Sequence, residues 1–394
     1  MSVAQDPVVL DLGSWTTKVG LASQSEPSTI FQSAVGVTRG QTEESQKDKL
    51  FVGDDAYGNF ETADIHRFIE RGAVKDFNAL EQVFNYIFDK KLNIGPFEHP
   101  FIITEPPLSA LSNREQIAEL LFEKYSVPSL TFQFQALLSL YAVGKTTGIA
   151  LDIGEGVIQI VPLYDSSIDI HAINRVNLGG KDITDLLINQ LDKRGLPFTT
   201  PIHRLIAEDI KSTMCRVSDD YQTELSNALA LKSSKEEKKS EEENNQDKYD
   251  GDYNAVEYEM PDGSKIEIIE EQIIGPELLF HPLSAGVEEM GIHQLLSDTI
   301  KRCAVDTRRD LLKNVVLSGG SSVFFGLKER LDKELTQSAA ASIKVTIETQ
   351  EDQDRQGILA WIGGAILATQ ESFEQMLIKR VEYDEEGVNI VHTR

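Results

Sequence analysis

Two short stretches of the sequence place an aspartate in the same setting of apolar residues and glycines. The first reads VVLDLGSWTTKVGLA over residues 8–22, and the second reads GIALDIGEGVIQIVP over residues 148–162. In each, an apolar run leads to an aspartate (Asp11 or Asp152), one apolar residue and a glycine, and a second apolar run follows. The match predicts an internal duplication, in which two lobes of common design each present a hairpin turn with one carboxylate.

Such a pair of turns could hold a phosphate chain together with a metal ion. Tight turns aim backbone N–H groups outward, and glycine lets a ligand approach closely, so the turns favour phosphate oxygens. A carboxylate repels phosphate, but a divalent cation between the two removes the conflict, and Mg²⁺ keeps several of its waters in such sites. The pair therefore predicts a metal–nucleotide clamped between two lobes. Two ordinary hairpins with acidic turns are the alternative.

A third glycine turn points to the rest of the same ligand. The stretch NVVLSGGSSVFFGL (residues 314–327) reads as an apolar strand, then Gly319 and Gly320, then a helix that begins near Gly326. Glycines there let the backbone pass beside a flat base or a ribose, and a helix N-terminus adds positive potential. We expect this loop to contact a nucleoside, although alone it would be only a strand–loop–helix connection.

The elements that must position these turns alternate between strands and helices. The aspartates fall in expected strands at 8–12 and 149–153, with return strands at 16–21 and 157–161. A β-branched run ended by prolines predicts a strand at 100–107. Apolar residues at helical spacing predict amphipathic helices at 112–125 (capped by Ser112 or Asn113), 181–191 and 326–335. This alternation predicts α/β layers rather than a helical bundle or a β-sandwich.

Composition narrows the class of protein. The 394 residues are too many for one hydrophobic core, so we expect two domains. The formal charge of −26 argues against nonspecific binding to nucleic acid or to anionic membranes, because Lys and Arg supply that affinity. The N-terminus lacks the basic and apolar regions of a signal peptide, so we expect an intracellular protein, cytosolic or nuclear.

Two segments are polar throughout. Residues 232–254 (KSSKEEKKSEEENNQDKYDGDYN) contain almost no apolar side chains, and the expectation is a disordered surface insertion, either a docking tether or a solvated loop. Residues 38–50 are expected to form an exposed loop.

Longer stretches resemble the actin family. The two aspartate turns resemble the family's first and second phosphate loops, and LSGGSSVFFG (317–326) resembles its adenosine loop. Residues 135–152, 178–187, 360–369 and 382–392 are similar to actin itself. MPDGSKIEI (260–268) and PELLFHP (276–282) are most similar to the dynactin actin-related protein, centractin. The resemblance covers nearly the whole chain.

The resemblance implies the α/β fold shared by actin, heat-shock proteins and sugar kinases (ribonuclease H-like), with two lobes, four subdomains and a central nucleotide cleft. The implied division is subdomain 1 at 1–33, 66–142 and 359–394, subdomain 2 at 34–65, subdomain 3 at 143–178 and 288–358, and subdomain 4 at 179–287.

The resemblance also implies a role for each matching residue. Asp11 and Asp152 would organise a hydrated Mg²⁺, and Gln135, Asp152 and Gln159 would be the catalytic residues, with Gln135 orienting the attacking water. The remaining contacts with ATP or ADP would come from Gly13, Ser14, Trp15, Lys18, Gly154, Glu155, Gly156, Val157, Lys211, Gly319, Gly320, Ser321 and Phe324.

Several of these positions depart from the family pattern. In the phosphate loops Trp15 replaces a glycine, Ile153 a serine and Glu155 an aspartate. Gln159 replaces a histidine that helps to order the hydrolytic water. Around the nucleoside Phe324 replaces a tyrosine, Ser212 a glutamate and Gly357 a basic residue. Because binding rests on many backbone contacts while hydrolysis depends on one positioned water, we expect Mg-ATP to bind and to be hydrolysed very slowly or not at all.

Three functions fit these observations. The first is a cytoskeletal actin-related protein, a centractin-like subunit of dynactin or a self-assembling filament subunit of the cytoplasm, with ATP as a structural clamp. The second is a nuclear scaffold subunit of a chromatin-remodelling complex that does not polymerise, because some nuclear actin-related proteins carry an aromatic residue in the first phosphate turn. The third, a sugar or acetate kinase, lacks a visible acceptor-site motif.

Overall fold

The computed structural model describes residues 5–38, 49–240, 253–338 and 344–393, and over 236–240 it describes the backbone alone. The chain divides into two compact units. The first comprises Met1–Gly180, Asp298–Val323 and Ala341–Arg394, and the second comprises Lys181–Ser297 and Phe324–Ala340. The division into four subdomains stays a prediction.

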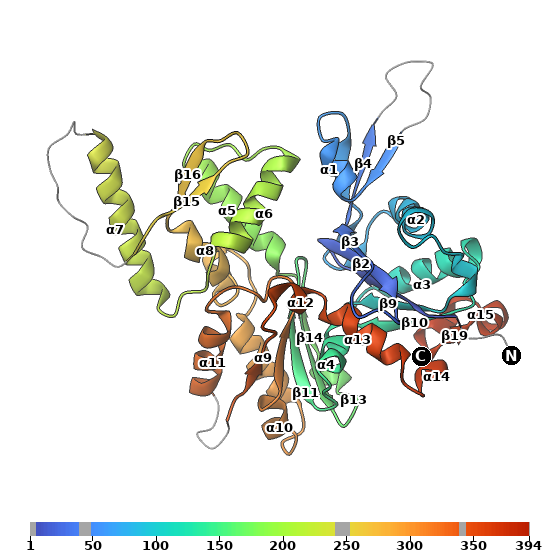
Figure 1. The fold of residues 1–394 in the computed structure, drawn as a ribbon. Coiled ribbons are helices and arrows are strands. Elements are labelled where there is room, and N and C mark those ends of the chain that lie inside the picture. Colours follow the sequence, from blue (N-terminus) through green and yellow to red (C-terminus); the bar gives the residue numbers. More distant parts are fainter. Residues whose placement is uncertain (1–4, 39–48, 241–252, 339–343, 394) are drawn as a thin grey trace, which may run out of the picture. The chain divides into compact units, whose positions relative to one another are not determined.

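The first sheet of the first unit has helices on both faces (Figure 1). Its strand order is β19–β10–β9–β1–β2–β3 (Ile378–Lys379, Ser129–Phe134, Phe101–Glu105, Val8–Leu12, Thr16–Leu21, Thr29–Gln32).

Successive residues of a strand point to opposite faces of the sheet. Val8, Leu10 and Leu12 therefore pack with α2 (Phe77–Tyr86), whereas Val9 packs with Trp361 of α13 (Leu359–Ala368). The predicted α/β layering is confirmed.

The second sheet of the same unit has the order β13–β12–β11–β17–β18 (Ser167–Ile168, Ile158–Tyr164, Gly148–Ile153, Val315–Ser318, Ile347–Glu348). Strand β14 (Asn174–Val176) also pairs with β12. Helix α4 (Gln135–Ala142) contacts the apolar clusters of both sheets. Its Leu138 belongs to the cluster of Val9 and Trp361, and its Leu137 packs with Ala150 of β11. This helix therefore joins the two sheets.

The two sheets repeat one arrangement of strands. Strand β1 pairs antiparallel with β2 and parallel with β9, and β11 pairs in the same ways with β12 and β17. The register places Asp11 opposite Lys18 and Asp152 opposite Gln159. The predicted internal duplication is confirmed, with return strands that begin at Thr16 and Ile158.

A small three-stranded sheet, in the order β5–β4–β6 (Lys49–Val52, Ala34–Thr38, Asp64–Arg67), follows β3 in the chain. It is accompanied by α1 (Asp54–Gly58) and by the β7–β8 hairpin (Ile69–Glu70, Ala73–Val74). The prediction of a loop over residues 38–50 is wrong at both ends, because Thr38 belongs to β4 and pairs there with Lys49 of β5. Its residues 39–48 lie outside the described residues.

The remaining helices of the first unit lie between and after these strands in the chain. They are η1 (Ile87–Leu92), η2 (Pro96–Glu98), α3 (Leu111–Glu119), η3 (Leu120–Lys124), η4 (Ile170–Ala172), α10 (Arg308–Leu312), α12 (Gln353–Gly357), α14 (Phe373–Met376), α15 (Arg380–Glu386) and η6 (Val388–His392). The helix predicted at 112–125 corresponds to α3 and η3, but the predicted cap is wrong. Helix α3 begins at Leu111 without a side-chain cap, and the Asn113 side chain instead accepts a hydrogen bond from the Val74 N–H.

The second unit consists mainly of helices around one hairpin. Its elements are α5 (Gly180–Lys193, starting at the boundary), α6 (Pro201–Met214), α7 (Tyr221–Ser240), β15 (Val256–Glu259), β16 (Lys265–Ile268), α8 (Glu271–Glu277), η5 (Pro282–Ala285) and α11 (Leu327–Ser338). Helix α9 (Ile292–Arg302) crosses into the first unit at Asp298. Apolar residues of α5, α6 and β16 form one core cluster, and α7 and α8 contribute to another.

The expected disorder of residues 232–254 is wrong at both ends. Residues 232–240 continue α7, where Lys232 pairs with the buried Glu270 and Lys235 pairs with Glu267. Tyr253 is buried, and its hydroxyl donates a hydrogen bond to the Ile269 carbonyl oxygen. Ion pairs and one buried aromatic residue thus stabilise these ends, and residues 241–252 lie outside the described residues.

No helix within the described ranges is long and apolar enough to cross a membrane.

Candidate functional site

Asp11 is the first buried carboxylate of the site, at the end of β1. Its Oδ2 accepts a hydrogen bond from Lys18 Nζ at 2.8 Å, and its Oδ1 accepts one from Thr104 Oγ1 at 2.6 Å. Burial alone would raise the pKa of Asp11. The Lys18 charge and the hydrogen bonds from Lys18, Thr104 and Gln135 outweigh burial, so the pKa is held below its ordinary value of 3.8.

Asp152 is the second buried carboxylate, at the corresponding place in β11. Its Oδ2 accepts a hydrogen bond from Ser318 Oγ at 2.8 Å, and its Oδ1 accepts one from Gln159 Nε2 at 3.1 Å. Burial, reinforced by the nearby charge of Asp11, raises the pKa of Asp152 to about 6 in spite of these bonds. The duplicated position opposite the carboxylate holds a cation in one sheet (Lys18) and a neutral amide in the other, which explains the difference in pKa.

Gln135 and Gln159 connect the two carboxylates. Gln135 Nε2 donates to Asp11 Oδ1 at 2.9 Å, and Gln135 Oε1 accepts from Gln159 Nε2 at 2.9 Å. The same Gln159 nitrogen also donates to Asp152. One chain of side-chain hydrogen bonds, which we call the amide bridge, therefore runs from Asp11 through Gln135 and Gln159 to Asp152. Gln159 is fully buried, and its Oε1 has no hydrogen-bond partner among the described residues.

The carbonyl oxygens of both turns are tied by donors from neighbouring elements. In the first turn, Ser33 Oγ donates to the Gly13 carbonyl oxygen and Arg67 Nη1 donates to that of Ser14. In the second turn, Gly180 N donates to the Gly154 carbonyl oxygen and Arg71 Nη1 to that of Gly156. Because C=O and N–H point in opposite directions across a trans peptide, these bonds turn the following N–H groups away from their donors. The N–H groups so oriented are those of Ser14, Trp15, Glu155 and Val157.

The two turns lie next to each other. A Cβ placed on Gly156 would come within 2.6 Å of Ser14 Oγ and 3.0 Å of the Arg71 Cα, so only glycine allows this approach. Ser14 Oγ also accepts a hydrogen bond from the Gly72 N–H at 2.9 Å. The pair of turns predicted to share one ligand is therefore brought together within the first unit.

Trp15, which replaces a glycine of the family pattern, is stacked against an arginine. The guanidinium carbon of Arg67 lies 3.9 Å from the centre of the Trp15 ring. The same guanidinium donates to the Ser14 carbonyl oxygen at 2.9 Å. The indole is thus held by Arg67 of β6.

The third glycine turn passes against the second. Gly319 has φ +88°, and a Cβ there would come within 2.5 Å of the Ile153 carbonyl oxygen, which also accepts a hydrogen bond from Ser321 N. Around Gly320 a Cβ would meet nothing within 4 Å. The predicted residues Gly319, Gly320 and Ser321 therefore join the site.

Two predicted nucleoside contacts belong to the second unit, so their part in the site stays a prediction. Lys211 is buried in α6 and pairs with Glu208 at 2.5 Å, and Phe324 is also buried. Ser212 is exposed on the same helix.

Sequence reasoning missed four residues that set the geometry. Thr104 and Ser318 lie near the end of a parallel neighbour of an aspartate strand, and each hydroxyl donates a hydrogen bond to the carboxylate of that strand. Their matching positions in the duplicated sheets could have identified them. Arg67 and Arg71 hold the turn carbonyls. Arg67 is the last residue of β6 and Arg71 lies in the turn of the β7–β8 hairpin, and no pattern in the sequence connects either residue with the turns.

The residues present suit a divalent cation with a phosphate ligand. Two buried carboxylates lie at the ends of one hydrogen-bonded chain, and their mutual repulsion contributes to the raised pKa of Asp152. Gln159 Oε1 is a buried acceptor without a donor among the described residues. No group of three or more His, Cys, Asp or Glu side chains in the described ranges could hold a metal by itself. The donor set therefore fits an ion that keeps most of its water shell, as Mg²⁺ does.

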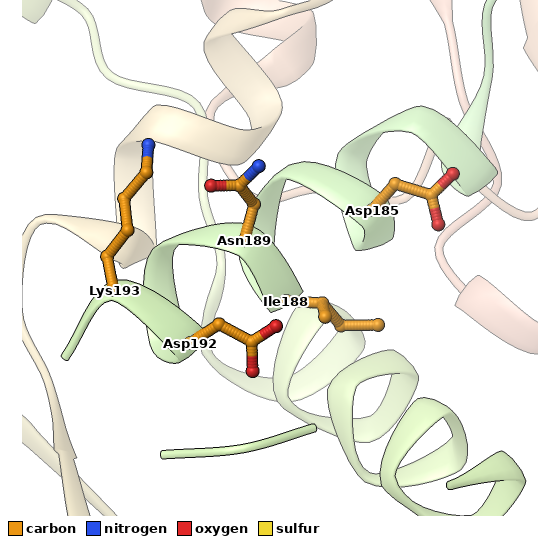
Figure 2. A pocket seen from close by; sticks show the side chains of 5 residues that line it. All are labelled: Asp185, Ile188, Asn189, Asp192 and Lys193. Atoms are coloured by element: carbon orange, nitrogen blue, oxygen red, sulfur yellow. The ribbon is translucent and has the colours of Figure 1, made fainter. Parts of the chain in front are cut away.

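A hollow of about 480 Å³ lies elsewhere, along α5 of the second unit, and Figure 2 shows the five side chains that line it. Asp185 of this hollow pairs with Arg204, and Asp192 Oδ1 accepts a hydrogen bond from the Phe198 N–H. Its lining includes no residue predicted for the site, and two of its three charged groups already have partners.

The comparison with known families agrees with this arrangement. The family model described as Actin matches residues 3–394. The chain belongs to the actin family. Actin-family proteins generally bind ATP or ADP with a divalent cation, and they typically assemble with protein partners or with themselves. The fold is accordingly the actin fold that the sequence predicted.

The raised pKa of Asp152 predicts a pH-dependent stability of the cation-free protein. A folded pKa of about 6 against an ordinary value of 3.8 means that the protonated carboxyl stabilises the fold. This contribution is complete below pH 3.8 and is lost as the pH rises through 6. At pH 8 in EDTA, we expect Asp152→Asn to raise the free energy of unfolding by up to about 3 kcal/mol, and by less at pH 5. Denaturant unfolding at the two pH values checks this, and an equal effect at both would contradict it.

Proposed function

We propose that this actin-family chain binds Mg-ATP at the two aspartate turns of its first unit, where the nucleotide acts as a structural ligand between the two sheets. The amide bridge carries the proposal. It joins one carboxylate from each sheet, and the N–H groups of the adjoining turns are oriented by tied carbonyl oxygens. Buried carboxylates that repel each other are most favourable when a cation lies near both.

Each part of the ligand has candidate partners. Asp11 and Asp152 would hold a hydrated Mg²⁺, which would neutralise charge on the phosphate oxygens. The oriented turn N–H groups and Lys18 would hold the β- and γ-phosphates. The loop with Gly319 and Gly320 would lie beside the adenosine, where the family pattern also places Lys211 and Phe324.

Hydrolysis is expected to be very slow or absent. A water that attacks the γ-phosphate needs an acceptor for its proton and a fixed orientation. The family pattern assigns the orientation of this water to Gln135, whose Oε1 already accepts a hydrogen bond from Gln159 Nε2. Gln159 carries an amide where the family pattern has a histidine, and an amide is no base. The chain is therefore proposed to be at most a slow ATPase.

Titration calorimetry with Mg-ATP tests the binding. We expect the wild-type protein to bind, and Asp152→Asn to bind at least about tenfold more weakly, because a charged partner of the hydrated cation is lost. The variant is expected to be more stable than the wild type without ligand, so weaker binding would not reflect unfolding.

Asp185→Asn, on the α5 helix of the second unit, is the matched control and should bind like the wild type. Absence of any heat with Mg-ATP for the folded wild-type protein would contradict the proposed function, as would unchanged affinity in Asp152→Asn.

Replacement of the amide at position 159 tests the account of hydrolysis. Gln159→His supplies an imidazole that can accept a proton, and we expect the rate of phosphate release to rise by about tenfold or more. Gln159→Asn keeps an amide and should show no rise. Several turnovers per minute by the wild-type monomer would contradict the proposal.

For the biological setting we propose a cytoskeletal subunit of the cytoplasm, in a dynactin-like or actin-like assembly. Its support is the resemblance to centractin in residues 260–268 and 276–282. The first range covers β16 with the turn before it, and the second covers the end of α8 with the turn that follows. A nuclear scaffold of a chromatin-remodelling complex is the second candidate, and the aromatic residue in the first turn favours it. Affinity purification with mass spectrometry separates them, because dynactin subunits support the first and remodeller ATPase subunits the second.

A further inference from the structure

The Trp15–Arg67 pair is a feature of this chain that the proposed function does not use. Arg67 lies in β6 of the small sheet, 52 residues beyond Trp15 in the sequence. Its guanidinium lies over the indole, with 3.9 Å between the guanidinium carbon and the ring centre. Such a cation–π contact is attractive, and more strongly so when it is shielded from water.

Few contacts hold the arginine in this position. Its Nη1 donates to the Ser14 carbonyl oxygen at 2.9 Å, whereas its Nη2 is buried and donates to no acceptor among the described residues. An unpaired buried nitrogen is unfavourable, so the stack and the single bond to Ser14 must outweigh its cost. The guanidinium is therefore held by the two residues of the turn itself.

That bond decides which way one peptide faces. The Ser14 carbonyl oxygen and the Trp15 N–H belong to one planar trans peptide, so an oxygen held toward Arg67 leaves the N–H on the opposite side. Without this bond the peptide could rotate. The large ring at position 15 also hinders the close approach of a ligand to the backbone that a glycine would allow. By fixing the orientation of the peptide, Arg67 compensates for the loss of glycine at this position.

We propose that Arg67 is a positioning residue for phosphate binding, which it promotes by locking Trp15 and presenting the Trp15 N–H to the phosphate chain. This inference rests on the proposed function. Arg67 lies on the carbonyl side of the peptide and acts through the turn without touching the ligand. Its effect should therefore be confined to the phosphate part of the nucleotide.

A double-mutant cycle scored by calorimetry with Mg-ATP tests the pair. We expect Arg67→Met and Trp15→Leu each to weaken binding by about five- to twentyfold, and the double variant to bind no more weakly than the worse single variant, because the two act as a unit. Arg67→Lys keeps a cation that can stack and donate, and it should recover most of the affinity. Adenosine, which lacks phosphates, should bind the wild type, the three variants of the cycle and Arg67→Lys equally.

Arg308→Met is the matched control, since Arg308 also donates to backbone carbonyl oxygens, those of Cys303 and Lys301, in the same unit. It should leave Mg-ATP affinity unchanged. Unaltered binding by Arg67→Met, additive losses in the double variant, or an equal loss of adenosine binding would overturn the inference. Wild-type protein that binds no Mg-ATP would overturn the proposed function. Wild-type protein that binds Mg-ATP while Arg67→Met binds it equally well would overturn this inference alone.

Discussion

The burial of two carboxylates, one from each sheet, is the constraint on which this site depends. Asp11 and Asp152 come from corresponding strands of the duplicated sheets, and neither can reach water easily. Lys18 compensates the first. The second has only the neutral donors Ser318 and Gln159, so burial, reinforced by the charge of Asp11, raises its pKa to about 6. Asp11 is thus readily ionised, whereas Asp152 keeps its proton to a higher pH. A cation placed near both would stabilise the ionised form of Asp152.

The scaffold is organised so that these groups meet. Each sheet contributes a strand with its aspartate, a return strand with the residue opposite, and a parallel neighbour with a hydroxyl donor. Helix α4 contacts the apolar clusters of both sheets, and its first residue, Gln135, is part of the amide bridge. Helix α4 therefore connects the two sheets in two ways, through its apolar packing and through the hydrogen bonds of Gln135.

Much of this could be predicted from sequence, because strong local patterns specify it. Apolar runs broken by Asp-x-Gly predicted both hairpins, and the resemblance to the actin family, which the family model confirms, supplied the fold. What could not be predicted depends on contacts distant in the sequence. The ion pairs of Lys232 and Lys235 extend α7 into a segment that composition marks as disordered. Arg67 reaches Trp15 only because the small sheet follows β3, and no local pattern encodes that approach.

The most direct test of the central claim is a titration of the two carboxyl groups themselves. In cation-free protein labelled with ¹³C at aspartate side chains, and assigned with Asp11→Asn and Asp152→Asn, the carboxyl shift of Asp152 should titrate near pH 6. Asp11 should remain ionised below its ordinary pKa of 3.8. Titration of both groups near 3.8 would mean that the carboxylates do not share a buried, unequally compensated site, and the account would be wrong.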